Sequence, residues 1–161
     1  MAPLTDLIDI LEKMHEEHQQ LLELAKEKRE VLISGDTEML QSLLSREARL
    51  LEAVGVLERE REQFVKDYQT SNGLEGTSYT LDELVEHVHQ PFLKNRITSA
   101  ASKLRNVIQE LSLANKDNQQ LIQTSLSYLH YSIGLFAGKE QTSGYGPNVK
   151  KRYSSMLDAK I

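Results

Sequence analysis

The sequence contains no cysteine, which excludes disulfides, thiolate zinc sites and cysteine nucleophiles. Tryptophan is also absent, and aromatic residues make up only 6% of the chain. No apolar run approaches the roughly 20 residues that span a bilayer, and no basic segment opens the N-terminus. We therefore expect a cytoplasmic protein without stable membrane insertion. The net charge of −5 argues against nucleic acid as a partner.

Motifs for catalysis and cofactor binding are also missing. The sequence has neither a glycine-rich phosphate loop nor a Gly-x-Ser-x-Gly nucleophile motif, so an enzyme has no positive support. Glu12 with His15, and Glu86 with His89, have the Glu-x-x-His spacing of di-metal carboxylate bundles. However, Glu12 directly follows the apolar position Leu11 and should point away from the core, and the second pair stands beside a proline. We expect no metal site and no cofactor.

What the sequence does contain is helical periodicity. The first segment has apolar residues at alternating spacings of three and four, which is typical of a helix packed along its whole length against others. The positions of this seam are Leu4, Leu7, Leu11, Met14, His18, Leu21, Ala25, Lys28 and Leu32. Gly35 suits a left-handed helix end, and Asp36 or Thr37 can cap the next helix.

A second helix is predicted from about Asp36 to Tyr68, with Glu47 and Arg61 interrupting its apolar stripe. After a loop, Thr80 and Glu83 match a capping box that starts a short helix ending near residue 89.

The Gln90-Pro91 step should then break the chain before the last helix, which is predicted from about Pro91 to Ile133. The fold class is therefore all-α. We expect an elongated, coiled-coil-like antiparallel bundle of three long helices, the third preceded by the short helix and a proline kink. Residues 1–137 should form this bundle, and residues 138–161 a flexible C-terminal tail.

The last helix has two unusual features. Asn115 and Asn118 lie on the face that carries Leu111, Ile122 and Leu129. These amides suit a face that binds another helix, although a solvated turn, or a buried amide that fixes the register of the bundle, would give the same pattern.

The second feature is an apolar, aromatic stretch with no obvious partner within the chain: Tyr128, Tyr131, Ile133, Leu135 and Phe136. Because the last helix is longer than the first two, its end should overhang them or stay loosely covered. Exposed aromatics of this kind indicate an interaction surface, and the alternative is simple capping of the bundle end.

Four motifs in order along the chain carry a resemblance to a known family. They are the Gly35-Asp36 break followed by Leu43-Leu44-x-x-Glu47, then Leu111-x-x-x-Asn115-x-x-Asn118-x-x-Leu121-Ile122, then Tyr145-Gly146-Pro147, and finally Met156-Leu157-Asp158-Ala159-Lys160. Together they resemble the FlgN family of flagellar export chaperones, over essentially the whole chain.

The resemblance implies a non-catalytic protein that binds the C-terminal helical segments of the hook-filament junction proteins FlgK and FlgL. It would deliver them to the type III export gate protein FlhA. The client-binding region of the family corresponds here to Leu111, Asn115, Asn118, Ile122, Leu129, Ile133 and Phe136, together with the tail. Tyr145 is the closest match to the tyrosine that docks on the gate, with Tyr153 as an alternative. A competing hypothesis is a structural coiled-coil protein that self-associates through its heptad seam.

Overall fold

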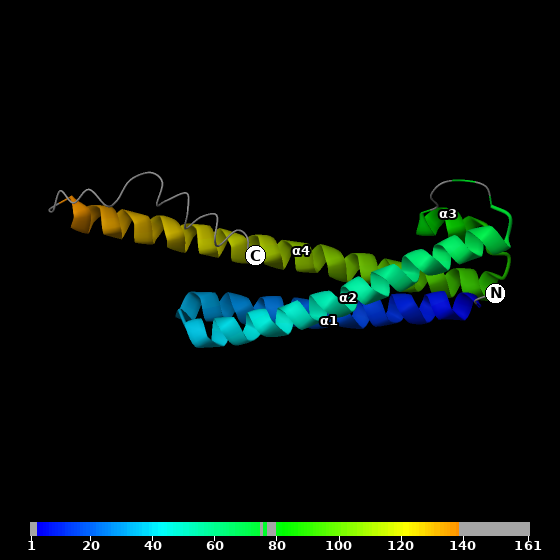
Figure 1. Cartoon of the computed structure of the whole chain (residues 1–161), viewed down its shortest axis with the longest axis horizontal. Helices are drawn as coiled ribbons and strands as arrows, with labels where there is room; N and C mark the ends of the chain where they lie inside the picture. Colours follow the sequence, from blue (N-terminus) through cyan, green and yellow to red (C-terminus); the bar gives the residue numbers. More distant parts are fainter. Residues whose placement is uncertain (1–2, 75, 77–79, 139–161) are drawn as a thin grey trace.

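The computed structural model describes residues 3–74, 76 and 80–138, and helices are the only regular secondary structure in this part of the chain. The four helices are α1 (Leu4–Ser34), α2 (Thr37–Ser71), α3 (Leu81–Glu86) and α4 (Pro91–Ala137). Figure 1 shows an elongated molecule in which α2 returns along α1, and α4 then runs in the same direction as α1. The helix α1 is central, because both α2 and α4 pack along it. The predicted all-α bundle of three long helices is confirmed.

The turn between α1 and α2 follows the local chemistry expected from the sequence. Gly35 has a φ of 75°, and its backbone N–H donates to the carbonyl of Val31. Only glycine adopts this left-handed conformation without a steric penalty. The carboxylate of Asp36 accepts a hydrogen bond of 3.0 Å from the backbone N–H of Met39. Asp36 is therefore the N-cap of α2, as predicted.

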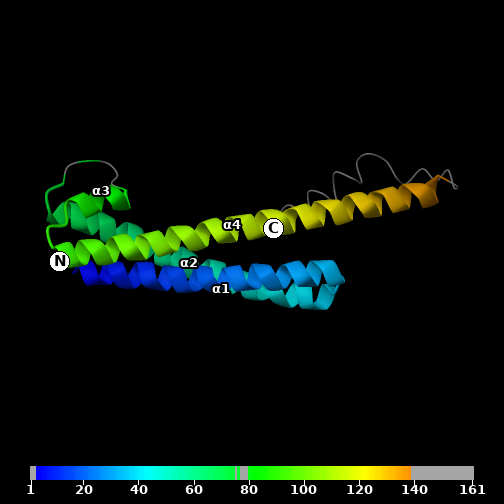
Figure 2. The same cartoon turned by 180° about the vertical axis from the view of Figure 1, so that it is seen from behind.

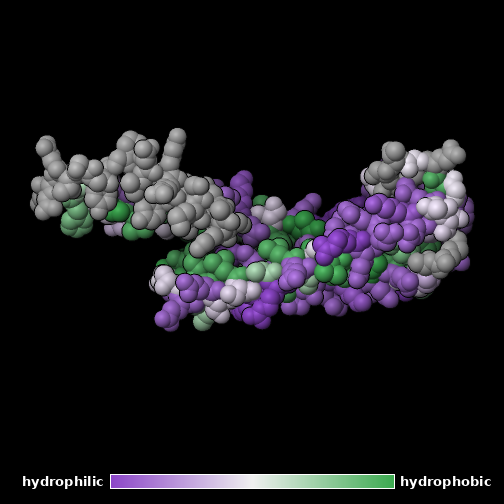
Figure 3. Space-filling view, in the orientation of Figure 1, coloured by the Kyte–Doolittle hydropathy of each residue, from purple (hydrophilic) through white to green (hydrophobic). Residues whose placement is uncertain are grey.

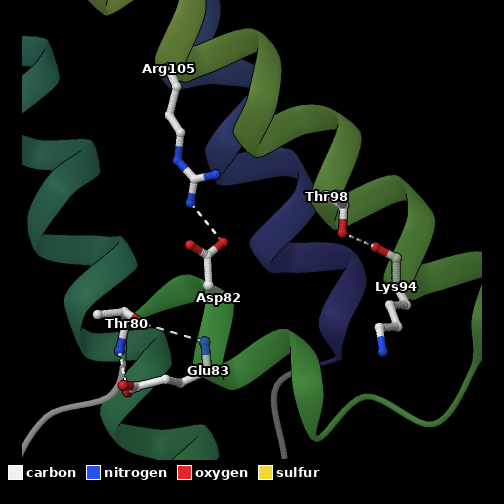
Figure 4. Close-up of polar contacts among 6 residues, drawn as sticks. All are labelled: Thr80, Asp82, Glu83, Lys94, Thr98 and Arg105. Atoms are coloured by element: carbon white, nitrogen blue, oxygen red, sulfur yellow. Dashed lines mark hydrogen bonds and ion pairs between the residues drawn. The ribbon is translucent and has the colours of Figure 1, made fainter.

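The short helix α3 is held at its start and tied to α4. Thr80 and Glu83 form a complete capping box, in which each side chain binds the backbone of the other residue. Arg105 of α4 reaches Asp82 at 2.8 Å, as Figure 4 shows. Helix α3 ends at Glu86, earlier than predicted, and α4 begins at Pro91, whose fixed φ suits a first helical turn.

The main hydrophobic core lies where α3 joins the three long helices. Leu84 of α3 is fully buried there, and Figure 2 shows this cluster of helices at one end of the molecule. The largest contributors from the long helices are Leu7, Ile8, Leu11, Phe64, Val65, Ile97 and Leu104. Because these residues come from every helix, this end of the molecule should be the most stable part.

The heptad seam of α1 is buried within the chain along most of its length. Leu7, Leu11 and Met14 are at most 5% exposed, and so are Leu21 and Lys28 farther along. The competing hypothesis needs this seam for self-association, but α2 and α4 already cover it. The predicted pattern is therefore correct, and its partner is the chain itself.

Two charged positions that interrupt the predicted stripes are both explained by pairing. Lys28 of α1 and Glu47 of α2 form an ion pair of 2.5 Å, with side chains only 6% and 17% exposed. Arg61 donates two hydrogen bonds to Glu58, at 2.9 and 2.6 Å. The hydrogen bonds from Arg61 hold the pKa of Glu58 below its usual value, against the opposing effect of partial burial.

Helix α4 continues to Ala137, beyond the predicted end at Ile133. Gly134 does not end the helix, because one interior glycine costs only about 1 kcal/mol relative to alanine. The predicted flexible tail, apart from Gly138, lies outside the described residues. Among the helices of the described part, none is both long and apolar enough to cross a membrane.

Candidate binding surface on the last helix

The end of α4 extends past the other helices. Asn118 lies beside α1, since its side-chain Nδ2 donates a 2.9 Å hydrogen bond to the carbonyl of Ala25. Helix α1 ends nine positions later at Ser34, whereas α4 runs on to Ala137. Residues 128–137 therefore form an overhang of about 15 Å. Figures 1 and 2 show this free end beyond the turn between α1 and α2.

One face of the overhang continues the stripe that holds α4 on α1. In the folded body this stripe includes Ile97 and Leu104, which are 0% and 7% exposed. The same helical spacing leads to Leu129, Ile133 and Phe136, which are 54%, 43% and 82% exposed. We call these three residues the overhang ridge. The inner part of this stripe is therefore covered by the other helices, whereas its outer part, the overhang ridge, has no helix packed on it in the described structure.

A second apolar face lies on the other side of the same segment. Tyr128, Tyr131 and Leu135 are 70%, 66% and 60% exposed, and we call them the aromatic face. Each residue turns the helix by about 100°, so Tyr131 lies about 160° away from both Leu129 and Ile133. The overhang thus presents apolar side chains on two nearly opposite sides.

The predicted binding residues nearer the body occupy different environments. Leu111 is half-buried, and with Asn115 and His18 it lines a shallow groove between α1 and α4. Ile122 is half-buried as well. Asn118 is only 2% exposed and bound to α1. Asn118 therefore has the position of a buried, register-setting amide, which the sequence left open as an alternative.

Charge is absent from the whole outer part of α4. From Asn118 to Gly138 the sequence has no Asp, Glu, Lys or Arg. The surface of the α1–α2 hairpin is mixed by comparison: in Figure 3 a green, hydrophobic band lies along the side that faces α4, and the remaining visible surface is mostly purple. A partner of the overhang would therefore be recognised through apolar contact and neutral hydrogen bonds.

The tip of the α1–α2 hairpin adds apolar surface that the sequence reading missed. Ile33 and Met39 flank the turn and are 60% and 49% exposed. Ile33 directly follows the last seam position, Leu32, and Met39 immediately precedes Leu40, an apolar residue of the second predicted helix. Because both residues are next to apolar stripe positions, the sequence pattern did not indicate that their side chains are exposed.

The histidine and glutamate pairs considered for metal binding do not gather into a site. Glu12 is exposed as expected and lies 3.5 Å from Arg96. The Nδ1 atom of His18 lies 2.6 Å from the carbonyl oxygen of Met14, one helical turn earlier. Within the described ranges, no group of three or more His, Cys, Asp or Glu side chains could hold a metal ion.

Tyr145, the predicted docking residue for the export gate, and the alternative Tyr153 lie outside the described residues. The described part of the chain therefore includes only the residues predicted to bind the client, and not those predicted to dock on the gate.

Comparison with known proteins places this architecture in a family. The chain is 24% identical over 151 residues to the uncharacterized protein YvyG of Bacillus subtilis, covering 89% of this chain and 87% of that protein. No solved structure is significantly similar to this chain. The family model described as FlgN protein matches residues 1–152. The chain therefore belongs to the FlgN family of flagellar export chaperones.

Proposed function

We propose that this protein is a cytoplasmic chaperone that binds the C-terminal helical segments of the hook-filament junction proteins FlgK and FlgL. It keeps them from aggregating and from assembling early, and it delivers them to the type III export gate. Family membership supports a role as a flagellar export chaperone in general. The specific clients are our proposal, and it rests on the overhang.

The observation that carries the proposal is the bare overhang ridge. Leu129, Ile133 and Phe136 continue a stripe whose inner half is buried against α1. An amphipathic client helix laid on the ridge would extend the α1–α4 packing beyond the end of α1. Ile122 and Leu111 lie on the same stripe and would contact the client where it approaches the body.

Delivery requires a second contact, with the gate protein FlhA. We assign it to Tyr145, because the chain around it, Tyr145-Gly146-Pro147, matches the family pattern. Tyr153 is the alternative docking residue. Since Tyr145 follows α4 by only a few residues, client binding and gate docking would occur next to each other in sequence.

The test is co-purification of FlgK with variants of the full chain. Substituting Leu129→Glu and Ile133→Glu together places two charges on the ridge, and we expect the complex to be lost. The matched control is Gln109→Glu, which adds a charge at an exposed polar position of α4 outside the overhang. Circular dichroism should show the same helix content in all variants, because none of these side chains is buried. A folded ridge variant that retains FlgK would refute the proposal.

A further inference from the structure

The aromatic face is not used by a single helix bound to the overhang ridge. An amphipathic helix presents an apolar stripe about 100° wide to its partner. Tyr131 lies about 160° from the ridge residues, so a helix seated on Leu129 and Ile133 leaves Tyr131 in water. Tyr131 and Leu135 are 66% and 60% exposed in the described structure, so neither is buried by the helices of the body.

The chain itself shows how such a two-sided helix is satisfied. Leu22 and Leu24 of α1 are also two positions apart, and thus about 160° apart around the helix. Both are buried, at 3% and 1% exposure, because α1 has α2 and α4 packed along it. A helix with apolar residues on opposite sides is covered here by two other helices.

We propose that the client contributes two helices, one on the overhang ridge and one on the aromatic face, so that the end of α4 becomes the middle helix of a three-helix assembly. This inference rests on the proposed function. The binding elements of the client would be uncharged on their inner sides, since residues 118–138 offer no charge to pair with. A single helical peptide would fill only half of the site.

Neither of the other available occupants suits both faces. The segment after Gly138 carries Lys139, Glu140, Lys150, Lys151, Arg152, Asp158 and Lys160, and so much charge is poorly matched to two faces that offer none. A second copy that offered its own overhang would bring only one helix. Two helices from one client satisfy both faces in a single binding event.

Because the protein has no native cysteine, introduced thiols report each face separately. We would label three single variants of the full chain with a maleimide: Leu129→Cys on the ridge, Tyr131→Cys on the aromatic face, and, as the control, Gln109→Cys at an exposed polar position on the inner half of α4. Full-length FlgK at about ten times its Kd leaves about a tenth of the protein free, so a covered thiol should react about tenfold more slowly. We expect this slowing for Leu129→Cys and Tyr131→Cys and little change for Gln109→Cys.

The outcomes separate this inference from the proposed function. Slowing at Leu129→Cys alone, with an intact complex on size exclusion, would overturn the two-helix inference and leave the chaperone proposal standing. Absence of any complex with the unsubstituted chain would refute the proposed function itself. The thiol of Tyr131→Cys could also react slowly without FlgK and react fast again once the chain is ended at Gly138. In that case the chain's own C-terminal segment covers the face, and the inference is wrong. Slowing that depends only on the protein's own concentration would overturn it in favour of a second copy.

Discussion

At the scale of single residues, the buried polar groups hold the helices in one alignment. Lys28 with Glu47 joins α1 to α2, and Asn118 joins α4 to α1. Apolar seams alone tolerate sliding by a heptad, whereas a buried polar group is satisfied at one register only. Asn118 therefore fixes where α4 lies along α1, and hence how much of α4 overhangs, whereas the Lys28–Glu47 pair fixes α2 on α1.

The Lys28–Glu47 pair can be tested against a neighbouring pair on the same two helices. Lys28→Met leaves the carboxylate of Glu47 largely buried without its partner, which should reduce the free energy of unfolding by about 3 kcal/mol. Glu27 and Arg46 lie one position earlier on each helix and form an exposed pair of 3.3 Å. Arg46→Met should therefore cost less than about 1 kcal/mol. Urea denaturation measures both values, and equal costs would contradict the structural role of Lys28.

Glu58 provides a prediction on pH dependence. Its pKa is lowered from an ordinary value of about 4.5, first by the hydrogen bonds from Arg61. A carboxylate with a lowered folded pKa stabilises the fold above the unfolded pKa and loses this contribution as the pH falls below it. The contribution is present at neutral pH and declines below about pH 4.5. It should be small, because the side chain is 42% exposed to solvent.

A carboxyl NMR titration should show the effect directly. In Arg61→Gln the midpoint of Glu58 should rise towards the ordinary value, and the decline of stability in acid should become shallower. Arg59→Gln removes a neighbouring positive charge without removing the donor, so it should leave most of the shift in place. An unchanged midpoint in Arg61→Gln would show that the hydrogen bonds do not set the pKa.

At the scale of helices, α4 has an inner and an outer half with different stability. Its inner half is buried against α1, whereas residues 128–137 lack a helix to pack on within the described structure. Isolated helices of this length are marginal in water. Amides of residues 128–137 should therefore exchange with solvent much faster than those of residues 97–118.

Hydrogen exchange measured by mass spectrometry tests this difference, with residues 97–118 of the same helix as the internal reference. Addition of FlgK should slow exchange in the overhang and leave the inner half nearly unchanged. Equal protection along all of α4 in the free protein would contradict the view that the overhang is unsupported.

Local patterns made most of the helices predictable. The left-handed Gly35, the Asp36 cap and the Thr80–Glu83 box each depend on a few neighbouring residues, so their chemistry can be read from sequence. The overhang followed from helix length alone. The burial of Asn118 and the partner of Lys28 did not, because they depend on which helix lies beside α1 and at what register. Two opposite charges that interrupt adjacent stripes were the available signal for the Lys28–Glu47 pair.

At the scale of the whole molecule, the charged residues and the proposed binding surface lie in different parts of the protein. The protein is acidic overall, with a net charge of −5, but the outer part of α4 is neutral from Asn118 to Gly138. Salt weakens attraction between exposed charges and leaves apolar contact largely intact.

Binding of FlgK should therefore depend little on ionic strength. Between 50 mM and 1 M NaCl we expect the Kd to change by less than about threefold. Isothermal titration calorimetry at several salt concentrations measures the Kd, and the series is repeated with Gln109→Glu to show how much one added charge outside the overhang contributes. A loss of affinity of more than about tenfold would show that charged residues outside the overhang carry the contact.

The division of α4 into a supported and a free half has an evolutionary consequence. Because Leu129, Ile133 and Phe136 contribute little to the core, substitutions there should leave the fold intact, and under the proposed function they would alter which client the protein binds. Substitutions at Ile97 and Leu104 should not be tolerated in this way, because these side chains are part of the core and their loss would destabilise the whole fold. If the free end binds the client as proposed, one continuous helix would adapt to a new client at that end while its other end keeps its packing.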